Sequence, residues 1–319
     1  MSAIWLDCDP GHDDAMAIIL AAYSANLLGI STSAGNQTIH KTTRNAIRVL
    51  SAIGKSYIPV VKGQAAPLIR PSMVCAEIHG ESGLDGLNDK PLFDEVDISH
   101  IQGPAPPVMY EQIRRYFYLT GQKVRLVGTG CLTNIALLLV LYPDVKSMID
   151  ISIMGGAIGI GNISPSAEFN ILLDPEAAKI VFESGVDLVM IPLEVTHTAL
   201  VTNEVLQKIG NSTPFTAKIC ELLNYFRKNY KEVFDFADPP LHDPLAIAYV
   251  LRPDLFTGRS MRVDIETQSD YSYGRTICDV WNKSTMKKNC WVATKVELDG
   301  FWDLMIQAVE LADSRSSLN

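Results

Sequence analysis

Residues 3–14 of the chain read AIWLDCDPGHDD, and their pattern predicts the first elements of the fold. The apolar run Ala3 to Leu6 predicts a buried strand that ends at Asp9, and Pro10-Gly11 predicts a turn after it. Helix-forming residues 15–22 follow, so we expect a helix that opens at the acidic pair Asp13-Asp14. The stretch therefore predicts a strand, a turn and a helix in succession, with carboxylates gathered at the turn.

Four carboxylates, those of Asp7, Asp9, Asp13 and Asp14, lie within eight positions of one another. A lone aspartate at a strand end usually shapes a turn, and acids in the first helical turn suit the helix dipole. Those roles account for two of the four. Packing all four together is electrostatically unfavourable unless a cation lies among them, and hard divalent cations prefer oxygen ligands. The cluster therefore predicts a metal-centred active site.

Strand-like and helix-like segments alternate along the chain. Short apolar, β-rich runs predict buried strands, whereas longer runs with helical periodicity predict helices at 38–53 and 132–141. The predicted strands are 27–33, 58–61, 124–127, 149–154 and 188–191. This alternation predicts an α/β fold with a doubly wound, mostly parallel sheet and helices on both faces, in which ligands bind at the carboxyl ends of the strands.

Composition narrows the class of protein. The 319 residues are 47% hydrophobic, which is enough for a large core, and no convincing linker divides them, so we expect one domain over residues 1–319. The formal charge of −9 argues against a nucleic-acid partner, and no apolar run reaches the ~18–20 residues of a membrane span. Six scattered cysteines and a strand directly after the first residues lead us to expect a reduced, cytoplasmic protein without a signal peptide.

Two later segments carry further candidate residues. Residues 64–107 are rich in Pro, Gly and polar side chains and contain His79, so they predict a long loop of the kind that is usually functional. His242-Asp243-Pro244 precedes an apolar helical run at 245–251. Asp243 there could be a plain helix N-cap followed by proline at the first helical position, although a capping carboxylate keeps one oxygen free for a metal. Thr213 to Tyr230 predicts a strong helix, and 231–241 an irregular aromatic segment.

The glycine-rich segment that starts at Met154 does not have the spacing of a dinucleotide-binding motif, and it lacks the lysine of a P-loop. It is followed by Asn162, Glu168 and Asn170, whose amide and carboxylate groups suit hydrogen bonds to a vicinal diol. A loop that serves only its own structure is the alternative for this segment. His79, His242 and nearby aromatic residues could flank a flat heterocycle, but such residues are more often surface or core positions.

Taken together, these segments resemble the nucleoside hydrolase family, the inosine–uridine preferring ribohydrolases. The resemblance covers nearly the whole chain, and the acidic stretch is its most specific part. The matching segments are Asp7 to Asp14, 34–38, 79–83, 129–136, 154–156, 167–170, 174–178 and 242–244. It implies a Rossmann-like single domain with a long active-site loop region, a homodimer or homotetramer, and hydrolysis of the N-glycosidic bond of ribonucleosides to free base and ribose.

The resemblance also implies roles for individual residues. Ca²⁺ would be ligated by Asp9, Asp14, Asp243 and the backbone carbonyl of Thr129, and Asp9 would be the general base toward a metal-bound water. His242 would be the acid for the leaving group, and Asp7 would support the site from behind. The ribose and base would be bound by Asp13, Asn36, His79, Met154, Asn162, Glu168, Phe169, Asn170 and Tyr230.

One departure from the family bears on specificity. Members that accept both base classes often carry a tyrosine where this chain has Phe226, so purine activation is in doubt, and residues 33–38 and 240–244 look closer to pyrimidine-preferring members. We therefore expect a preference for uridine or cytidine, with a broad or purine-preferring hydrolase as the alternative. A haloacid-dehalogenase-type phosphatase also begins with a strand and Asp-x-Asp, but it does not explain Asp13-Asp14. A non-catalytic nucleoside-binding protein is the third possibility.

Overall fold

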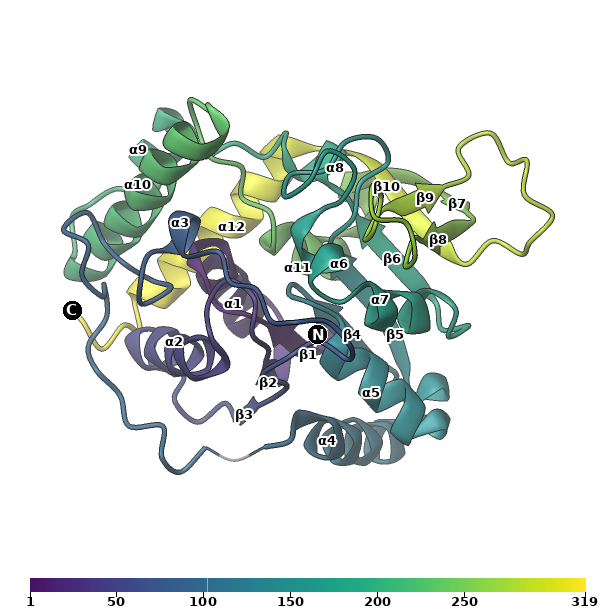
Figure 1. Ribbon diagram of the computed structural model, residues 1–319. Helices are drawn as coiled ribbons and strands as arrows, with labels where there is room; N and C mark the ends of the chain where they lie inside the picture. The colour runs from purple at the N-terminus through teal and green to yellow at the C-terminus, as the bar shows by residue number, and fades with distance from the viewer. Residues whose placement is uncertain (102) are drawn as a thin grey trace.

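The computed structural model describes residues 1–101 and 103–319 and is built around one eight-stranded sheet (Figure 1). The strand order is β3-β2-β1-β4-β5-β6-β10-β7, and every neighbouring pair is parallel except β10 and β7. β8 and β9 form a separate antiparallel pair. The strands are β1 Ala3–Cys8, β2 Asn26–Thr32, β3 Val60–Lys62, β4 Val124–Gly128, β5 Ile149–Met154, β6 Leu188–Ile191, β7 Phe256–Met261, β8 Val263–Ile265, β9 Thr276–Cys278 and β10 Cys290–Val296.

Helices cover both faces of the sheet, which confirms the predicted doubly wound α/β fold. One hydrophobic core joins α1, α2, α11 and α12 to one face, and a second core joins α4, α5 and α7 to the other. The α-helices are α1 His12–Ser24, α2 Ile39–Ala52, α3 Ala76–His79, α4 Ala105–Thr120, α5 Thr133–Leu141, α6 Phe169–Leu173, α7 Pro175–Phe182, α8 Leu193–Thr196, α9 Asn203–Ile209, α10 Pro214–Phe234, α11 Pro244–Leu251 and α12 Leu298–Asp313. Among the described residues, Pro143–Ser147 and Pro253–Leu255 form 3₁₀ helices.

Several predicted boundaries differ from the structure. Strand β1 ends at Cys8 rather than Asp9, because the chain turns at Asp9-Pro10 into the site. Helix α10 continues through Phe234, so the prediction that residues 231–234 are irregular was wrong; the Phe234 ring packs on that of Tyr230, with centroids 5.2 Å apart. The helix ends at Asp235, which adopts the left-handed conformation.

The long loop predicted over residues 64–107 is interrupted twice. It contains the short helix α3, and helix α4 begins inside it at Ala105. The prolines at 106 and 107 indicated a loop in the sequence, yet they occupy the first turn of α4, where a backbone N–H has no helical partner to lose. Strands β7 to β10 and helix α12 follow residue 251, beyond the last segment for which an element was predicted. Within the described residues, no helix combines the length and the apolarity that crossing a membrane requires.

The parallel strands all end at the same edge of the sheet. There β1 pairs with both β2 and β4, and β4 pairs with β5. The residues that follow these strands, including Asp9, Asn36 and Thr129, are therefore brought together although they are far apart in sequence. This edge carries the candidate site.

Candidate active site

The floor of the site is made of four buried aspartates. Asp9 follows β1, Asp13 and Asp14 lie in the first turn of α1, and Asp243 directly precedes α11. Each is at most 5% exposed. The positive end of the α1 dipole favours two of these carboxylates but cannot balance all four. The site thus concentrates negative charge in a region from which water is largely excluded.

The Asp9 carboxylate is closely surrounded by backbone, and one of its oxygens accepts no hydrogen bond from the described residues. Its Oδ2 accepts a 2.7 Å hydrogen bond from the backbone N–H of Asn36, whereas Oδ1 is buried and receives none from any residue that the structure describes. A Cβ on Gly35 would lie 2.0 Å from Oδ2, and one on Gly130 would lie 2.5 Å from Oδ1. Only glycine fits at these two positions. A buried carboxylate oxygen without a hydrogen-bond partner fits coordination of a metal or of a polarised water.

Asp13, Asp14 and Asp243 meet beside Asp9. One oxygen from each of the three lies within 4.8 Å of the other two. Burial raises the pKa of Asp243 and Asp9 well above the usual range, and neighbouring carboxylates raise them further; burial also raises the pKa of Asp13 to about 7. Buried carboxylates at this separation can all stay ionised when a cation lies among them. The all-oxygen donor set fits a hard divalent metal ion.

The metal ligands predicted from the sequence differ in part from the three aspartates that meet in the structure. Asp14 and Asp243 belong to both, but the grouping includes Asp13 where the prediction has Asp9. The hydroxyl of Thr129 donates to Asp14 Oδ1 at 2.8 Å, and the Thr129 carbonyl accepts a 2.9 Å bond from the Asn170 amide. That carbonyl has a second lone pair available for a metal. Asp243 is the N-cap residue of α11 and Pro244 its first residue, as the helix-start alternative predicted, but the Asp243 side chain makes no capping hydrogen bond to the helix.

A pocket of about 530 Å³ of empty space, open to solvent, lies above this floor. The pocket is lined by Asp13, Asn36, Cys75, Ile78, His79, Thr129, Met154, Asn162, Ile163, Glu168, Phe169, Asn170, Phe226, Tyr230, Phe234, His242 and Asp243. Every substrate-binding residue predicted from the sequence is in this set, whereas Asp9 and Asp14 lie beneath it, fully buried.

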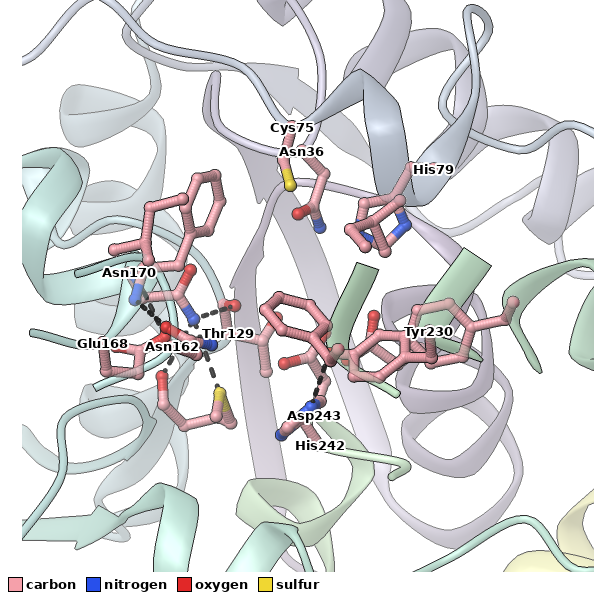
Figure 2. A pocket seen from close by; sticks show the side chains of 17 residues that line it. Asn36, Cys75, His79, Thr129, Asn162, Glu168, Asn170, Tyr230, His242 and Asp243 are labelled. Carbon is pink, nitrogen blue, oxygen red and sulfur yellow. Dashed lines mark hydrogen bonds between the residues drawn. The ribbon is translucent and has the colours of Figure 1, made fainter. Parts of the chain in front are cut away.

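One wall of the pocket is polar. In Figure 2, Asn162, Glu168 and Asn170 gather on the side of the cavity away from Tyr230 and His242. Glu168 caps α6 by accepting from the backbone N–H groups of Asn170 and Ile171, and Asn162 Oδ1 accepts from Phe169 N at 3.0 Å. Burial raises the pKa of Glu168 to about 7. These residues therefore hold their own loop in shape and also face the cavity, and their binding of a diol stays a prediction.

The opposite wall carries imidazole and aromatic rings. Tyr230 Oη lies 2.8 Å from His242 Nε2, and a dashed line in Figure 2 marks this hydrogen bond. His79 lies further along the same side of the pocket. Phe226 packs against the ring of His79 at 5.7 Å and against Tyr230 edge-on at 4.6 Å. Burial lowers the pKa of both histidines well below the usual value, so both rings are neutral near pH 7.

Further buried groups support the two walls. His12 donates its backbone N–H to His79 Nδ1 at 3.2 Å, and its ring is stacked on Phe226. Asp7 lies behind the acidic floor, where its Oδ1 accepts hydrogen bonds from Ser31 and from Asn134. Burial raises the pKa of Asp7 to about 7. Asp7 is thus outside the residues that line the pocket, and its supporting role stays a prediction.

Sequence reasoning missed part of the site. Cys75, Ile78 and Ile163 line the pocket but carry no pattern that distinguishes them from other loop residues. Thr196 is different: it is fully buried, and its hydroxyl lies 2.7 Å from His242 Nδ1. It follows the predicted strand 188–191 within a few residues, so the rule that ligands gather at the carboxyl ends of strands could have identified it.

Comparisons with known proteins agree with this geometry. A probable ribonucleoside hydrolase of Dictyostelium discoideum is 50% identical over 96% of this chain and 94% of its own length. The pyrimidine-specific ribonucleoside hydrolase RihA of Escherichia coli (strain K12) is 44% identical over 95% of this chain and 96% of its own. Among solved structures, a purine-preferring ribonucleoside hydrolase from Gardnerella vaginalis superposes with a TM-score of 0.88 at 29% identity, covering 98% of this chain and 100% of that one.

The model of the family described as inosine-uridine preferring nucleoside hydrolase matches residues 4–303. This match, together with the relatives, leaves no support for the phosphatase alternative. The chain belongs to the inosine-uridine preferring nucleoside hydrolase family and is a ribonucleoside N-ribohydrolase, as its sequence motifs predicted.

Proposed function

We propose that this enzyme cleaves the N-glycosidic bond of pyrimidine ribonucleosides, using a water that Asp9 deprotonates beside a Ca²⁺ ion. The observation that carries the proposal is the layout of the cavity. A buried acidic floor with an unused Asp9 oxygen lies between a polar wall and a wall of imidazole and aromatic rings. A ribose fits over the floor and against the polar wall, which leaves its base between the rings.

The cation would be held by Asp9, Asp14, Asp243 and the Thr129 carbonyl, with Asp13 close to Asp14 and Asp243. Calcium is the ion of choice here because it accepts ~6–8 oxygen ligands with flexible geometry. When bound, Ca²⁺ would lower the pKa of a coordinated water and bind the ribose hydroxyls. Asp9 Oδ1, which has no other partner among the described residues, is the group that would take the proton from the attacking water.

Cleavage of the C–N bond builds positive charge on the ribose ring. Glu168 and Asp13 both face the pocket, so their carboxylates would stabilise this charge where water is excluded. Asn36, Asn162 and Asn170 would orient the sugar, and Met154 and Phe169 would pack against it. The polar wall is already held rigid by its own hydrogen bonds, so little ordering is required when substrate binds.

The base would leave on the side of His79, His242 and Tyr230. Its electron pair stays with the base when the bond breaks, so a donor must stabilise the departing anion. The hydrogen-bonded pair of His242 and Tyr230 is the donor we assign, with the proton reaching the base from this pair. Phe226 and the ring of His79 would flank the base as flat surfaces.

Two observations support a pyrimidine preference. Relatives that are 43–44% identical over at least 95% of this chain are named pyrimidine-specific, whereas the purine-preferring structure is only 29% identical. Phe226 also brings no hydroxyl to the base side of the pocket, so one potential donor to a purine is missing. A purine-preferring or broad enzyme remains the second candidate.

We also propose that the protein is a homodimer or homotetramer, and light scattering would test this oligomeric state.

A kinetic panel with uridine, cytidine, inosine and adenosine tests the function, at saturating Ca²⁺ and after chelation. We expect uridine or cytidine to have the highest kcat/KM, and activity to be lost on chelation and restored by Ca²⁺. A much higher kcat/KM for inosine than for uridine would contradict the base preference. Restoration by Mg²⁺ alone, but not by Ca²⁺, would contradict the assigned metal.

A further inference from the structure

Thr196 is connected to the pocket through a chain of hydrogen bonds. It is the last residue of α8, it is completely buried, and its Oγ1 lies 2.7 Å from His242 Nδ1. The other ring nitrogen of His242, Nε2, lies 2.8 Å from Tyr230 Oη. Because His242 and Tyr230 both line the pocket, this chain runs from a buried hydroxyl to the position where a base would lie.

The hydrogen bonds between Thr196, His242 and Tyr230 can run in two directions, depending on which ring nitrogen of His242 carries the proton. A neutral imidazole carries a proton on one ring nitrogen and presents a lone pair on the other. If the proton is on Nδ1, the ring donates to Thr196 and Tyr230 must donate to Nε2, which turns the phenol proton away from the pocket. If the proton is on Nε2, Thr196 donates to Nδ1, the ring donates to Tyr230, and the phenol proton is free to point into the pocket.

The surroundings of the Thr196 hydroxyl favour the second direction. Its one proton can go to His242 Nδ1 at 2.7 Å or to the Leu193 carbonyl at 3.4 Å. The first distance is that of a strong hydrogen bond, and the second is at the limit of one. The Leu193 carbonyl is also satisfied already, because it accepts the backbone N–H of His197 at 2.9 Å. The Leu193 carbonyl therefore keeps a hydrogen bond when Thr196 donates to His242.

We propose that Thr196 is a positioning residue that donates its hydroxyl proton to His242 Nδ1 and so keeps the ring proton of His242 on Nε2, the pocket side. The role rests on the proposed function, in which the leaving base requires a donor. When the C–N bond breaks, its electron pair remains on the base, and the phenol proton of Tyr230 moves to the base. The hydrogen bond from His242 Nε2–H stabilises the phenolate, which takes a proton back from water after the base departs.

The first test needs no variant of Thr196. In protein with ¹⁵N-labelled histidine, NMR distinguishes the protonated from the unprotonated ring nitrogen, and comparison with the His242→Gln spectrum assigns the His242 signals. We expect the proton on Nε2. A proton on Nδ1 would overturn the proposal, and this result does not depend on any substrate or on the folding of a Thr196 variant.

The second test compares Thr196→Val, which removes the hydroxyl, with Thr196→Ser, which keeps it. Thr198→Val is the matched control, because the Thr198 hydroxyl lies in the same segment and donates only to the Val195 carbonyl among the described residues. A wrong histidine tautomer costs up to ~10⁴-fold in a serine protease triad, so we expect Thr196→Val to lower kcat on uridine at least ~10-fold with KM nearly unchanged. Thr196→Ser and Thr198→Val should stay close to the wild type.

p-Nitrophenyl riboside separates the positioning role from a structural one. Its leaving group needs no proton, so Thr196→Val should hydrolyse it at nearly the wild-type rate. Equal losses on uridine and on p-nitrophenyl riboside, or no loss on uridine, would refute the role of Thr196. Failure of the proposed function would be visible separately, as a wild-type protein that hydrolyses no nucleoside of the panel.

Discussion

Chelation of divalent cations is expected to lower the thermal stability of this protein. Asp13, Asp14 and Asp243 each place an oxygen within 4.8 Å of the other two, and Asp9 lies beside them with a buried oxygen that accepts no hydrogen bond from the described residues. At an effective dielectric constant of ~20, two unit charges 4.8 Å apart repel by about 3.5 kcal/mol. A cation among these groups removes this repulsion, and it can do so only in the folded protein, where the carboxylates meet.

The magnitude follows from mass action. A cation at about 100 times its Kd stabilises the folded state by about 2.7 kcal/mol. An unfolding entropy of about 2.1 cal/mol/K per residue amounts to about 0.7 kcal/mol/K for 319 residues. The ratio of the two predicts that Tm rises by about 4 °C when Ca²⁺ is present at that level, and by about 6 °C at 1,000 times Kd.

Differential scanning calorimetry in EGTA and in excess Ca²⁺ measures this shift. The variants Asp9→Asn, Asp13→Asn, Asp14→Asn and Asp243→Asn should each reduce it, and their ranking decides whether Asp9 or Asp13 is the stronger ligand. Asp254→Asn is the control, since this exposed carboxylate is paired with Arg252 at the surface. An unchanged Tm on chelation, or a full Ca²⁺ shift in Asp243→Asn, would refute the reasoning.

Four further substitutions test the site, each with circular dichroism as a check of the fold. Asp9→Ala should lower kcat on uridine by ~10²–10⁴-fold, the usual contribution of a general base, and normal turnover would exclude that role. His242→Ala should slow uridine by ~10²-fold or more and spare p-nitrophenyl riboside; equal losses would argue against a donor role. Gly35→Ala puts a Cβ 2.0 Å from Asp9 Oδ2, so we expect the calcium affinity measured by titration calorimetry to fall at least ~10-fold. An affinity equal to that of the wild type would show that the backbone around Asp9 can move to accommodate the Cβ. Phe226→Tyr adds a hydroxyl on the side of the pocket assigned to the base. One additional hydrogen bond should raise the inosine-to-uridine ratio of kcat/KM about tenfold. An unchanged ratio would show that residue 226 does not determine the base preference.

Much of the fold could be predicted because its signals are local. Apolar runs such as Ile149–Met154 and Leu188–Ile191 coincide with strands in the structure, since a parallel sheet covered on both faces needs continuous hydrophobic segments. The prediction failed where local signals conflicted with packing. The prolines after Ala105 indicated a loop but begin α4, and Phe234 extends α10 because it packs on Tyr230.

The order of residues alone was enough to predict that acidic groups follow a strand, that a Pro-Gly turn lies among them, and that strands and helices alternate along the chain. These features depend on the order and spacing of neighbouring residues. Only the tertiary structure decided which distant residues meet. Asp243 joins Asp13 and Asp14, and Thr196 reaches His242 across 46 positions, because the parallel sheet brings its strand ends to one edge. Such contacts depend on strand order and on the direction of each side chain, which no local pattern encodes.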